Sequence, residues 1–236
     1  MKGLIVAAGQ GTRLRDIAIS KPLAKVRGKP LIERVIETAH AAGVAEFVVV
    51  TGYEGPRVEA FLRRLAMRRG FAITTVRNPD WVLANGHSVV AAAPHLDDRF
   101  VLMMADHLFD PSLLADLLAA PAAADEVVLA VDRRLDNPLV DLEDVTRVET
   151  DADGAILRIG KLIEPYNAFD TGVFVASRAL IEGLREDIAQ GGAGGISAGM
   201  TRLAERGLAK TFDIGARFWL DVDDAAAHRQ AQRLSA

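Results

Sequence analysis

The sequence predicts an α/β fold in which a mostly parallel β-sheet lies between two layers of helices. Three observations favour this class: short apolar segments recur along the chain, segments of helical periodicity separate them, and glycines or acidic residues follow some of the apolar segments directly. Ligands of such sheets bind beyond the carboxyl ends of the strands. Residues that directly follow a strand are therefore the first candidates for function.

Residues 4–131 supply five predicted strands and three predicted helices. The strands are short, largely apolar throughout and typical of buried strands; they cover residues 4–7, 47–51, 72–76, 100–104 and 127–131. Apolar residues at helical spacing lie in three segments between them, at residues 31–36, 58–65 and 113–118.

The pattern changes after about residue 132. Residues 145–150 and 155–159 flank a turn-forming segment, 151–154, and predict a β-hairpin. A strand at 171–176, helices at 179–187 and 198–206, and a last strand at 218–222 follow, with Asp223 or Asp224 near the start of a closing helix. The glycine-rich segment 191–195 predicts a flexible loop, and a connector between two helices is favoured over a substrate lid.

Composition excludes several classes of protein. The 236 residues suffice for one large domain or a core with an appended lobe, and 32 acidic against 28 basic residues give a net charge of −4, which disfavours a nucleic-acid partner. No cysteine is present, so thiolate zinc sites and cysteine nucleophiles are excluded. We see no apolar run long enough for a signal-peptide core or a membrane span, and expect a cytoplasmic protein without membrane insertion.

A glycine-containing loop follows the first predicted strand, at residues 7–14. Such a loop lets backbone N–H groups face a phosphate. It is not the dinucleotide fingerprint, because Leu14 stands where the third glycine would be, and no Gly-Lys-Ser or Gly-Lys-Thr of a P-loop follows. Arg13, Lys21 and Lys25 follow closely, and these cations could neutralise a triphosphate. The alternative is a solvated basic loop.

Three aspartates predict a metal site. Asp106 follows the strand 100–104, and Asp221 and Asp223 come at the end of the last strand, where alternate residues share a face if the strand continues through both. Mg²⁺ prefers oxygen ligands and usually takes one or two carboxylates together with phosphate oxygens and water. Only one of Asp221 and Asp223 need be a ligand, and a turn or helix cap is the alternative reading of each aspartate.

These segments resemble the signature of the nucleoside-triphosphate transferases that activate small phosphates and sugar phosphates. The resemblance covers nearly the whole chain, although the family usually has proline before the lysine at the position of Lys21, where this chain has Ser20. The runs that carry it are residues 7–13, 28–32, 85–88, 104–107, 160–161, 166–172 and 218–223. The pair 106–107 and the runs 170–172 and 221–223 are most similar to the CTP:inositol-1-phosphate cytidylyltransferases, with the choline-phosphate cytidylyltransferases as the nearest rival.

The resemblance implies a Rossmann-like three-layer α/β/α fold with a mostly parallel mixed sheet and a small acceptor-binding subdomain. We expect a single nucleotidyltransferase domain over residues 1–236, with a nucleotide-binding core at about 1–132 and 207–236 and an acceptor-binding portion at about 133–206. The implied catalytic residues are Arg13, Lys21 and Lys161. The implied nucleotide-binding residues are Ala7, Ala8, Gly9, Gly11, Thr12, Asn85, Gly86 and Ser88. The implied acceptor-binding residues are His107, Asp170, Thr171 and Gly172, and the metal ligands for Mg²⁺ are Asp106, Asp223 and Asp221.

The expected reaction is transfer of a cytidylyl group from CTP to a small phosphorylated polyol, inositol 1-phosphate, with release of pyrophosphate. Hydrogen bonds between acceptor hydroxyls and Asp170 or Thr171 would suit a polyol, whereas choline would need an aromatic cage, and only two Trp, two Tyr and nine Phe are present. The alternatives are a sugar-1-phosphate nucleotidyltransferase that uses UTP, dTTP or GTP, a phosphocholine cytidylyltransferase, and a non-catalytic nucleotide-binding regulatory protein. The sequence leaves the acceptor's stereochemistry and the oligomeric state open.

Overall fold

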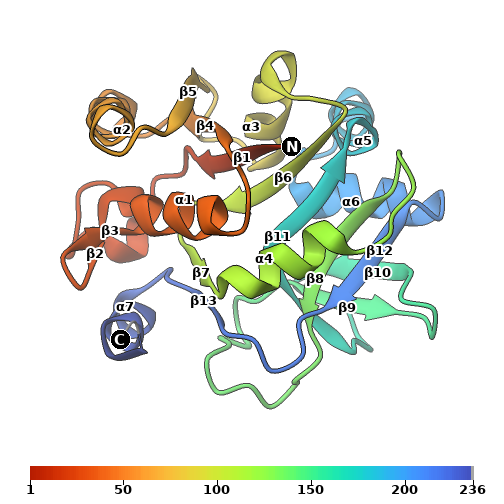
Figure 1. Cartoon of the computed structure of the whole chain (residues 1–236). Coiled ribbons are helices and arrows are strands. Elements are labelled where there is room, and N and C mark those ends of the chain that lie inside the picture. Colours follow the sequence, from red (N-terminus) through yellow and green to blue (C-terminus); the bar gives the residue numbers. More distant parts are fainter. Residues whose placement is uncertain (235–236) are drawn as a thin grey trace.

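A nine-stranded mixed sheet forms the centre of the molecule (Figure 1). The structure is a computed structural model, and it describes residues 1–234. The strands of the main sheet are β1 (Lys2–Ala7), β4 (Glu46–Thr51), β5 (Ala72–Arg77), β6 (Arg99–Met104), β8 (Val127–Asp132), β9 (Arg147–Thr150), β10 (Ile156–Gly160), β11 (Ala168–Ser177) and β12 (Ala209–Asp213). Their order is β10-β9-β11-β6-β1-β4-β5, and β8 pairs with β11 and β12.

The sheet is parallel in its first half and mixed in its second. Strands β6, β1, β4 and β5 run parallel, which aligns their carboxyl ends along one edge. Strand β11 runs antiparallel to β6 and also pairs with β8 and β9. It therefore joins the segment after residue 132 to the parallel half in one continuous sheet.

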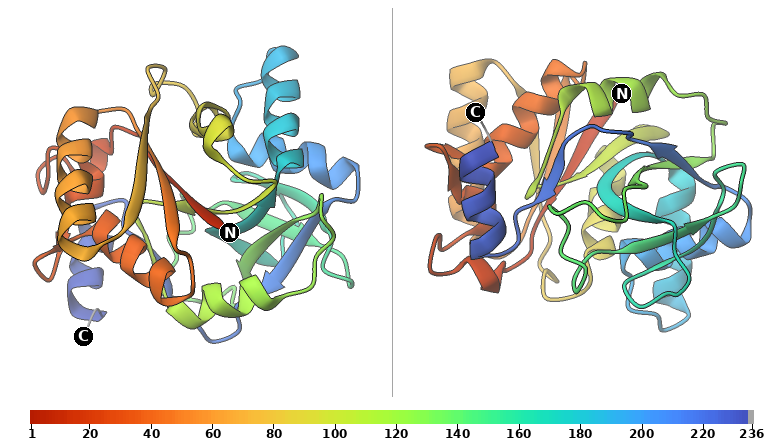
Figure 2. Two further views of the ribbon diagram at one scale, coloured as in Figure 1. Left: turned by 45° about the horizontal axis from the view of Figure 1, so that its top comes forward. Right: turned by 90° about the horizontal axis from the view of Figure 1, so that it is seen from below.

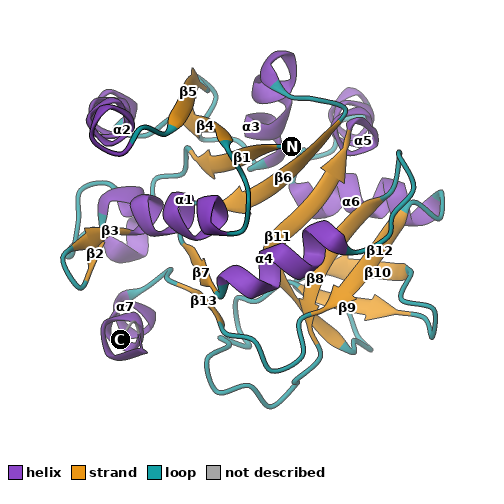
Figure 3. Cartoon of the chain, viewed as in Figure 1, coloured by secondary structure: helices purple, strands orange, loops and turns teal. Residues whose placement is uncertain are grey.

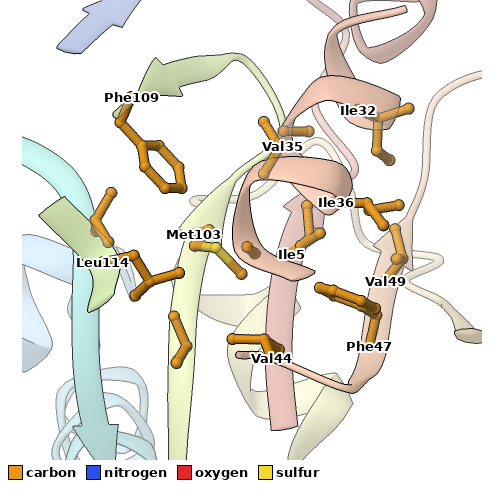
Figure 4. Packing of buried hydrophobic residues seen from close by; sticks show 14 of the residues in the cluster. Ile5, Ile32, Val35, Ile36, Val44, Phe47, Val49, Met103, Phe109 and Leu114 are labelled. Atoms are coloured by element: carbon orange, nitrogen blue, oxygen red, sulfur yellow. The ribbon is translucent and has the colours of Figure 1, made fainter. Parts of the chain in front are cut away.

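Helices cover both faces of the sheet (Figure 3). Neighbouring residues of β1 point to opposite faces. Ile5 belongs to a core cluster that includes residues of α1 (Leu31–Ala41), α2 (Gly55–Arg69) and α4 (Pro111–Ala119). Leu4 belongs to the cluster that includes residues of α3 (Gly86–Ala92), α5 (Arg178–Ala189) and α6 (Ile196–Glu205). Figure 4 shows the first of these faces, where Val35 and Ile36 of α1 lie over Ile5 and Met103. Burial of strands on both faces explains why they are apolar throughout.

A third, smaller apolar cluster brings the C-terminal segment to the loop after β1. The small sheets β2 (Lys25–Val26) with β3 (Lys29–Pro30) and β7 (His107–Phe109) with β13 (Trp219–Asp221) meet α7 (Ala225–Leu234) there. Leu14, Leu108, Leu220 and Ala231 are buried together in this cluster. Both views of Figure 2 show α7 beside the N-terminal segment that carries β2 and β3. The C-terminal segment and the segment that follows β1 thus meet in one region.

Most predicted elements are confirmed, and three corrections follow from their surroundings. The strand predicted at 72–76 is present as β5, but it lies at the edge of the sheet and most of its residues are exposed rather than buried. The last predicted strand, 218–222, ends at Asp221 and pairs with β7 outside the main sheet, so Asp223 lies beyond it. Strands β2, β3, β7 and β12 were not predicted, and β11 is longer than predicted.

The start of the closing helix agrees with one of the two predicted caps. The Asp224 carboxylate accepts a hydrogen bond from the Ala227 backbone N–H at 2.7 Å, at the start of α7. None of the helices within residues 1–234 is long and apolar enough to cross a membrane.

Candidate active site

A cavity of about 530 Å³ opens at the carboxyl ends of β1 and β6, beside β11. A smaller hollow of about 310 Å³, lined by the loop after β1, adjoins it, and Gly9, Arg13, Lys21, Asp106 and Asp223 line both. The position agrees with the rule that ligands of parallel sheets bind beyond the carboxyl ends of the strands.

Gly11 shapes the loop after β1. Its backbone is in the left-handed region, with φ 59°, and an added Cβ would lie 2.3 Å from the Cβ of Lys21, so glycine is required here. Leu14 is fully buried in the third apolar cluster and anchors the loop. Gly9, Gly11 and Thr12 line the smaller hollow together with Ala7. These four predicted nucleotide-binding residues are therefore brought together.

The three predicted catalytic cations enter one network of ion pairs with carboxylates. Lys21 pairs with Asp106 and Asp223. Arg13 pairs with Asp223 and, at 2.6 Å, with Asp144. Lys161 pairs with Asp144. Charges that are more than a hundred residues apart in sequence thus meet across the cavity.

The pairing of β13 with β7 brings the predicted metal ligands together. Asp106 lies in the turn between β6 and β7, Asp221 is paired with His107 across the two strands, and the Val222 backbone N–H donates to the Asp106 carbonyl at 3.0 Å. The backbone of the C-terminal segment is therefore held next to Asp106, and Asp221 and Asp223 line the same cavity.

His107 lies among these carboxylates. Its Nδ1 is 2.9 Å from Asp106 Oδ1 and 3.7 Å from Asp221 Oδ1, and its ring stacks on Trp219 with centroids 6.4 Å apart. Burial by itself lowers the pKa of His107, but Asp221, Asp106 and Asp170 outweigh it and raise the pKa to about 9. The imidazole is therefore protonated at neutral pH.

The environment of two of the carboxylates, Asp170 and Asp221, disfavours their charged form. Burial raises the pKa of Asp170 to about 6, against the lowering effect of the Gly172 N–H and of His107. Burial also raises the pKa of Asp221 to about 6, with Asp106 and Asp144 adding to the rise. Perturbed groups that cluster in a cavity are typical of functional sites.

Asp170 and Gly172 occupy a break in the pairing of β11. On one side of β11, β6 pairs with residues from Val173 onward and β9 pairs with Ala168 and Phe169. Between these two partners the backbone turns at Gly172, with φ 75°, where a Cβ would lie 2.6 Å from the His107 ring. The break exposes Asp170 and Gly172 to the cavity.

Four predicted site residues do not line either hollow. Thr171 is fully buried and its hydroxyl donates to the Ala130 carbonyl at 2.8 Å, so the predicted acceptor contact of its side chain is corrected. Ser88 is 2% exposed and accepts from Asn78 Nδ2 at 3.1 Å. Gly86 is buried against the Gly194 carbonyl, and Ala8 packs in the core of the second face. Alternation of side chains along extended backbone explains Ala8 and Thr171, since every second residue of such a run faces inward. Gly86 and Ser88 instead belong to the buried side of helix α3.

The segment 85–88 nevertheless contributes to the cavity through Asn85. Asn85 lines the cavity and its Oδ1 accepts from the Ile196 N–H at 2.9 Å. Ile196 and Ser197, at the start of α6, line the same wall.

Asp144 belongs to the site but was not among the predicted residues. It lies in the loop between β8 and β9, in an acidic segment that carries no motif and is typical of a solvated surface. Only its pairing with Arg13 and Lys161, which depends on the tertiary structure, identifies it.

Within residues 1–234, two groups of side chains could hold a divalent metal ion. One consists of Asp106, His107 and Asp221, and the other of Asp144, Asp221 and Asp223; within each group one potential ligand atom per residue lies within 4.8 Å of the others. Asp221 Oδ1 is buried without a hydrogen-bond partner among the described residues, as expected for an oxygen that binds a cation. A protonated His107 is a poor ligand, so the carboxylates are the better candidates.

Comparison with known proteins agrees with this geometry. A family model of the MobA-like NTP transferase domain matches residues 3–203. The bifunctional IPC transferase and DIPP synthase of Rubrobacter xylanophilus is 37% identical over 223 residues, which cover 93% of this chain and 48% of that protein. The protein of the same name from Aquifex aeolicus is 30% identical over 224 residues, with 93% and 48% covered. The chain thus spans about half the length of these curated relatives.

A solved structure is similar over nearly the whole chain. The inositol-1-phosphate CTP transferase from T. maritima superposes with a TM-score of 0.86 and 26% identity, covering 98% of this chain and 95% of that one.

Proposed function

The chain belongs to the family of MobA-like NTP transferase domains, and from this premise we propose that it transfers the cytidylyl group of CTP to inositol 1-phosphate. The observation that carries the proposal is the convergence of Arg13, Lys21 and Lys161 on one cavity beside the glycine loop. The names of the relatives from Rubrobacter xylanophilus and T. maritima support the choice of substrates.

In the proposed reaction, an oxygen of the acceptor phosphate attacks the α-phosphorus of CTP. The bond from this phosphorus to the bridging oxygen breaks, and pyrophosphate leaves. Arg13 and Lys21 would hold the triphosphate and neutralise the leaving group, and Lys161 would hold the acceptor phosphate. Because the phosphate nucleophile is already ionised at neutral pH, catalysis consists of holding two anions in line and neutralising their charge.

We further propose Mg²⁺ as the metal, held by Asp106 and by Asp221 or Asp223. Oxygen donors from carboxylates suit this ion, and it would supply charge neutralisation at the phosphates. Arg13 and Lys21, which pair with Asp223, would act beside it.

A hydroxylated acceptor is supported by the lining of the cavity. Asp170 presents a carboxylate in the break of β11, where it could accept hydrogen bonds from ring hydroxyls. Among the described residues, the only Phe, Tyr or Trp side chains that line the cavity are Phe174 and Trp219, and Trp219 stacks on protonated His107. That surface does not form the aromatic cage that a quaternary ammonium group requires.

The proposal is tested by incubating the purified chain with Mg²⁺, each of the nucleotides CTP, UTP, dTTP, GTP and ATP, and inositol 1-phosphate, glucose 1-phosphate or phosphocholine. Pyrophosphate release is the readout, with mass spectrometry of the product. We expect turnover with CTP and inositol 1-phosphate to exceed every other combination. Faster reaction of glucose 1-phosphate with UTP, dTTP or GTP, or of phosphocholine with CTP, would assign the chain to the corresponding alternative.

A further inference from the structure

Asp144 connects two cations that come from distant parts of the chain. Arg13 lies in the loop after β1, and Lys161 directly follows β10. One carboxylate oxygen of Asp144 is 2.6 Å from Arg13 Nη2, and the other pairs with Lys161 Nζ. The Asp144 side chain is 28% exposed, and those of Arg13 and Lys161 are 46% and 55% exposed. Solvated anions can therefore reach all three groups.

The two cations differ in their other partners. Arg13 also pairs with Asp223, whereas Asp144 is the only carboxylate within ion-pair distance of Lys161 in residues 1–234. Without Asp144, Lys161 would keep its positive charge with no carboxylate beside it. Like charges on Arg13 and Lys161 would then repel each other, and Lys161 would lose the carboxylate that fixes its position, whereas Arg13 would keep Asp223.

We propose that Asp144 is a positioning residue that takes the place of substrate phosphate in the free enzyme. It holds Arg13 and Lys161 in the cavity, and the phosphates of the two substrates displace it when they bind. The inference depends on the proposed function, which assigns Arg13 to the nucleotide and Lys161 to the acceptor. Its consequence is that Asp144 weakens the binding of phosphate groups while it keeps the two cations in place.

A different role is open to the same carboxylate, since Asp144 is one of the three aspartates whose oxygens could share a metal ion. The two roles predict opposite responses. Loss of a metal ligand raises the Mg²⁺ concentration needed for activity, whereas loss of a competing anion strengthens phosphate binding even without metal.

The first test measures binding of inorganic pyrophosphate to metal-free protein by calorimetry, in EDTA at low ionic strength. We expect Asp144→Asn to bind pyrophosphate about three- to tenfold more tightly than the wild-type chain, because two partly exposed ion pairs no longer compete. Glu143→Gln is the matched control, since it removes the same charge from the same loop and Glu143 makes no side-chain hydrogen bond or ion pair with the described residues. Unchanged or weaker binding to Asp144→Asn would overturn the proposal.

A second substitution tests whether the increase in pyrophosphate affinity depends on Lys161, the ion-pair partner of Asp144. In the Lys161→Gln background, Asp144→Asn should increase the affinity for pyrophosphate much less than it does in the wild-type chain. High salt should also reduce the increase that Asp144→Asn causes in the wild-type chain. A gain that persists in the double variant would contradict the pairing. These measurements need no turnover, so they remain valid if CTP and inositol 1-phosphate prove not to be the substrates.

The kinetic test uses the active enzyme with Mg²⁺. For Asp144→Asn we expect lower KM values for both substrates together with a lower kcat, an unchanged Mg²⁺ dependence, and partial recovery of kcat in Asp144→Glu. A merely structural role would raise KM instead. A tenfold rise in the Mg²⁺ concentration for half-maximal activity would make Asp144 a metal ligand and overturn the proposal.

Discussion

Among single residues, Asp223 joins two of the proposed catalytic cations, because both Arg13 and Lys21 pair with it. Asp106 shares Lys21 and also accepts from His107. These contacts hold the cations above the glycine loop, and the same oxygens are available to a divalent ion. Removing either carboxylate should therefore affect the proposed metal ion as well as the two cations.

We expect Asp106→Ala and Asp223→Ala each to lower kcat by about 100-fold or more, since loss of a metal ligand costs several kcal/mol of charge stabilisation and each ~1.4 kcal/mol is tenfold in rate. Steady-state pyrophosphate release with CTP and inositol 1-phosphate measures this effect, and EDTA should abolish activity of the wild-type chain. Asp153→Ala, in the exposed turn between β9 and β10, is the control. Full activity in metal-free buffer would refute the metal assignment.

The burial of the Asp170 carboxylate lowers the stability of the fold, although the proposed function requires that carboxylate in the cavity. Its pKa is raised from 3.8 to about 6 by burial, so between these pH values the folded state binds more protons than the unfolded state. Stability from this group therefore falls as pH rises from about 4 to 6, and the cost persists at higher pH. A residue that costs stability and is exposed to the cavity is better explained by function than by folding.

Asp170→Asn should raise the free energy of unfolding at pH 8 by roughly 1–3 kcal/mol and by less at pH 5, because the amide has no charge to bury. Urea unfolding at the two pH values measures the difference, and turnover of inositol 1-phosphate should fall in the same variant. A variant less stable than wild type at pH 8 would show that the carboxylate stabilises the fold.

The sequence predicted which residues could carry charge chemistry but not every direction in which they point. Arg13 and Asp106 follow parallel strands, whose carboxyl ends lie at one edge of the sheet. Lys161 follows the antiparallel strand β10, and Asp221 and Asp223 reach the same cavity through the pairing of β13 with β7. Thr171 could not be told from its neighbours, since its burial depends on the Ala130 carbonyl of a neighbouring strand. The role of Asp144 depends on a loop whose course no local pattern specifies.

Among the elements, the loop between α5 and α6 shows how a predicted connector shares in the site. The Asp187 carboxylate accepts from the Gly194 N–H at 3.0 Å, and His87 Nε2 lies 3.3 Å from the Ala193 carbonyl. The loop is thereby held against the start of α3, next to Asn85. Its glycines do more than provide flexibility, because side chains at two of them would collide with neighbours.

Two glycine substitutions distinguish the effect of backbone strain from the effect of losing the contact between this loop and His87. Gly194 has φ 72°, and a Cβ would lie 2.7 Å from His87 Nε2, whereas Gly191 has φ 82° with no atom within 4 Å of an added Cβ. Both Gly194→Ala and Gly191→Ala should lose about 1 kcal/mol or more of stability through strain. Only Gly194→Ala should also raise the KM for CTP, about threefold or more, because it displaces the loop from the Asn85 segment. Equal KM values for CTP in the two variants would show that the loop does not contribute to the nucleotide site.

Three of the four strands that the sequence did not predict share a physical cause, and the exception is β12, which has five residues. Strands β2, β3 and β7 are two or three residues long, which is too short for a periodic pattern. The exposed position of β5 depends on which strand lies at the edge of the sheet, and composition does not specify strand order. The long, buried strands β1, β6 and β8 were predictable because burial on both faces requires continuous apolar sequence.

In the molecule as a whole, the lining of the cavity extends from Val6 in β1 to Gln230 in α7. The glycine loop, the turn after β6, the loop after β8, β11 and the C-terminal segment all contribute to it. A ligand in this cavity therefore contacts parts of the chain that are distant in sequence. Ligand binding should consequently oppose global unfolding rather than the unfolding of one loop.

CTP with Mg²⁺ should raise the melting temperature of the whole chain. A ligand at about 100 times its dissociation constant stabilises the native state by about 2.7 kcal/mol, which for a chain of this size corresponds to a rise of about 5–10 °C. Differential scanning fluorimetry with CTP, UTP, GTP and ATP measures it, and Arg13→Ala should lose most of the shift because it removes a phosphate-facing cation. We expect the largest shift with CTP. Equal shifts with all four nucleotides would mean that the cavity binds the triphosphate without selecting the base, and no shift with any of them would contradict its assignment as the nucleotide site.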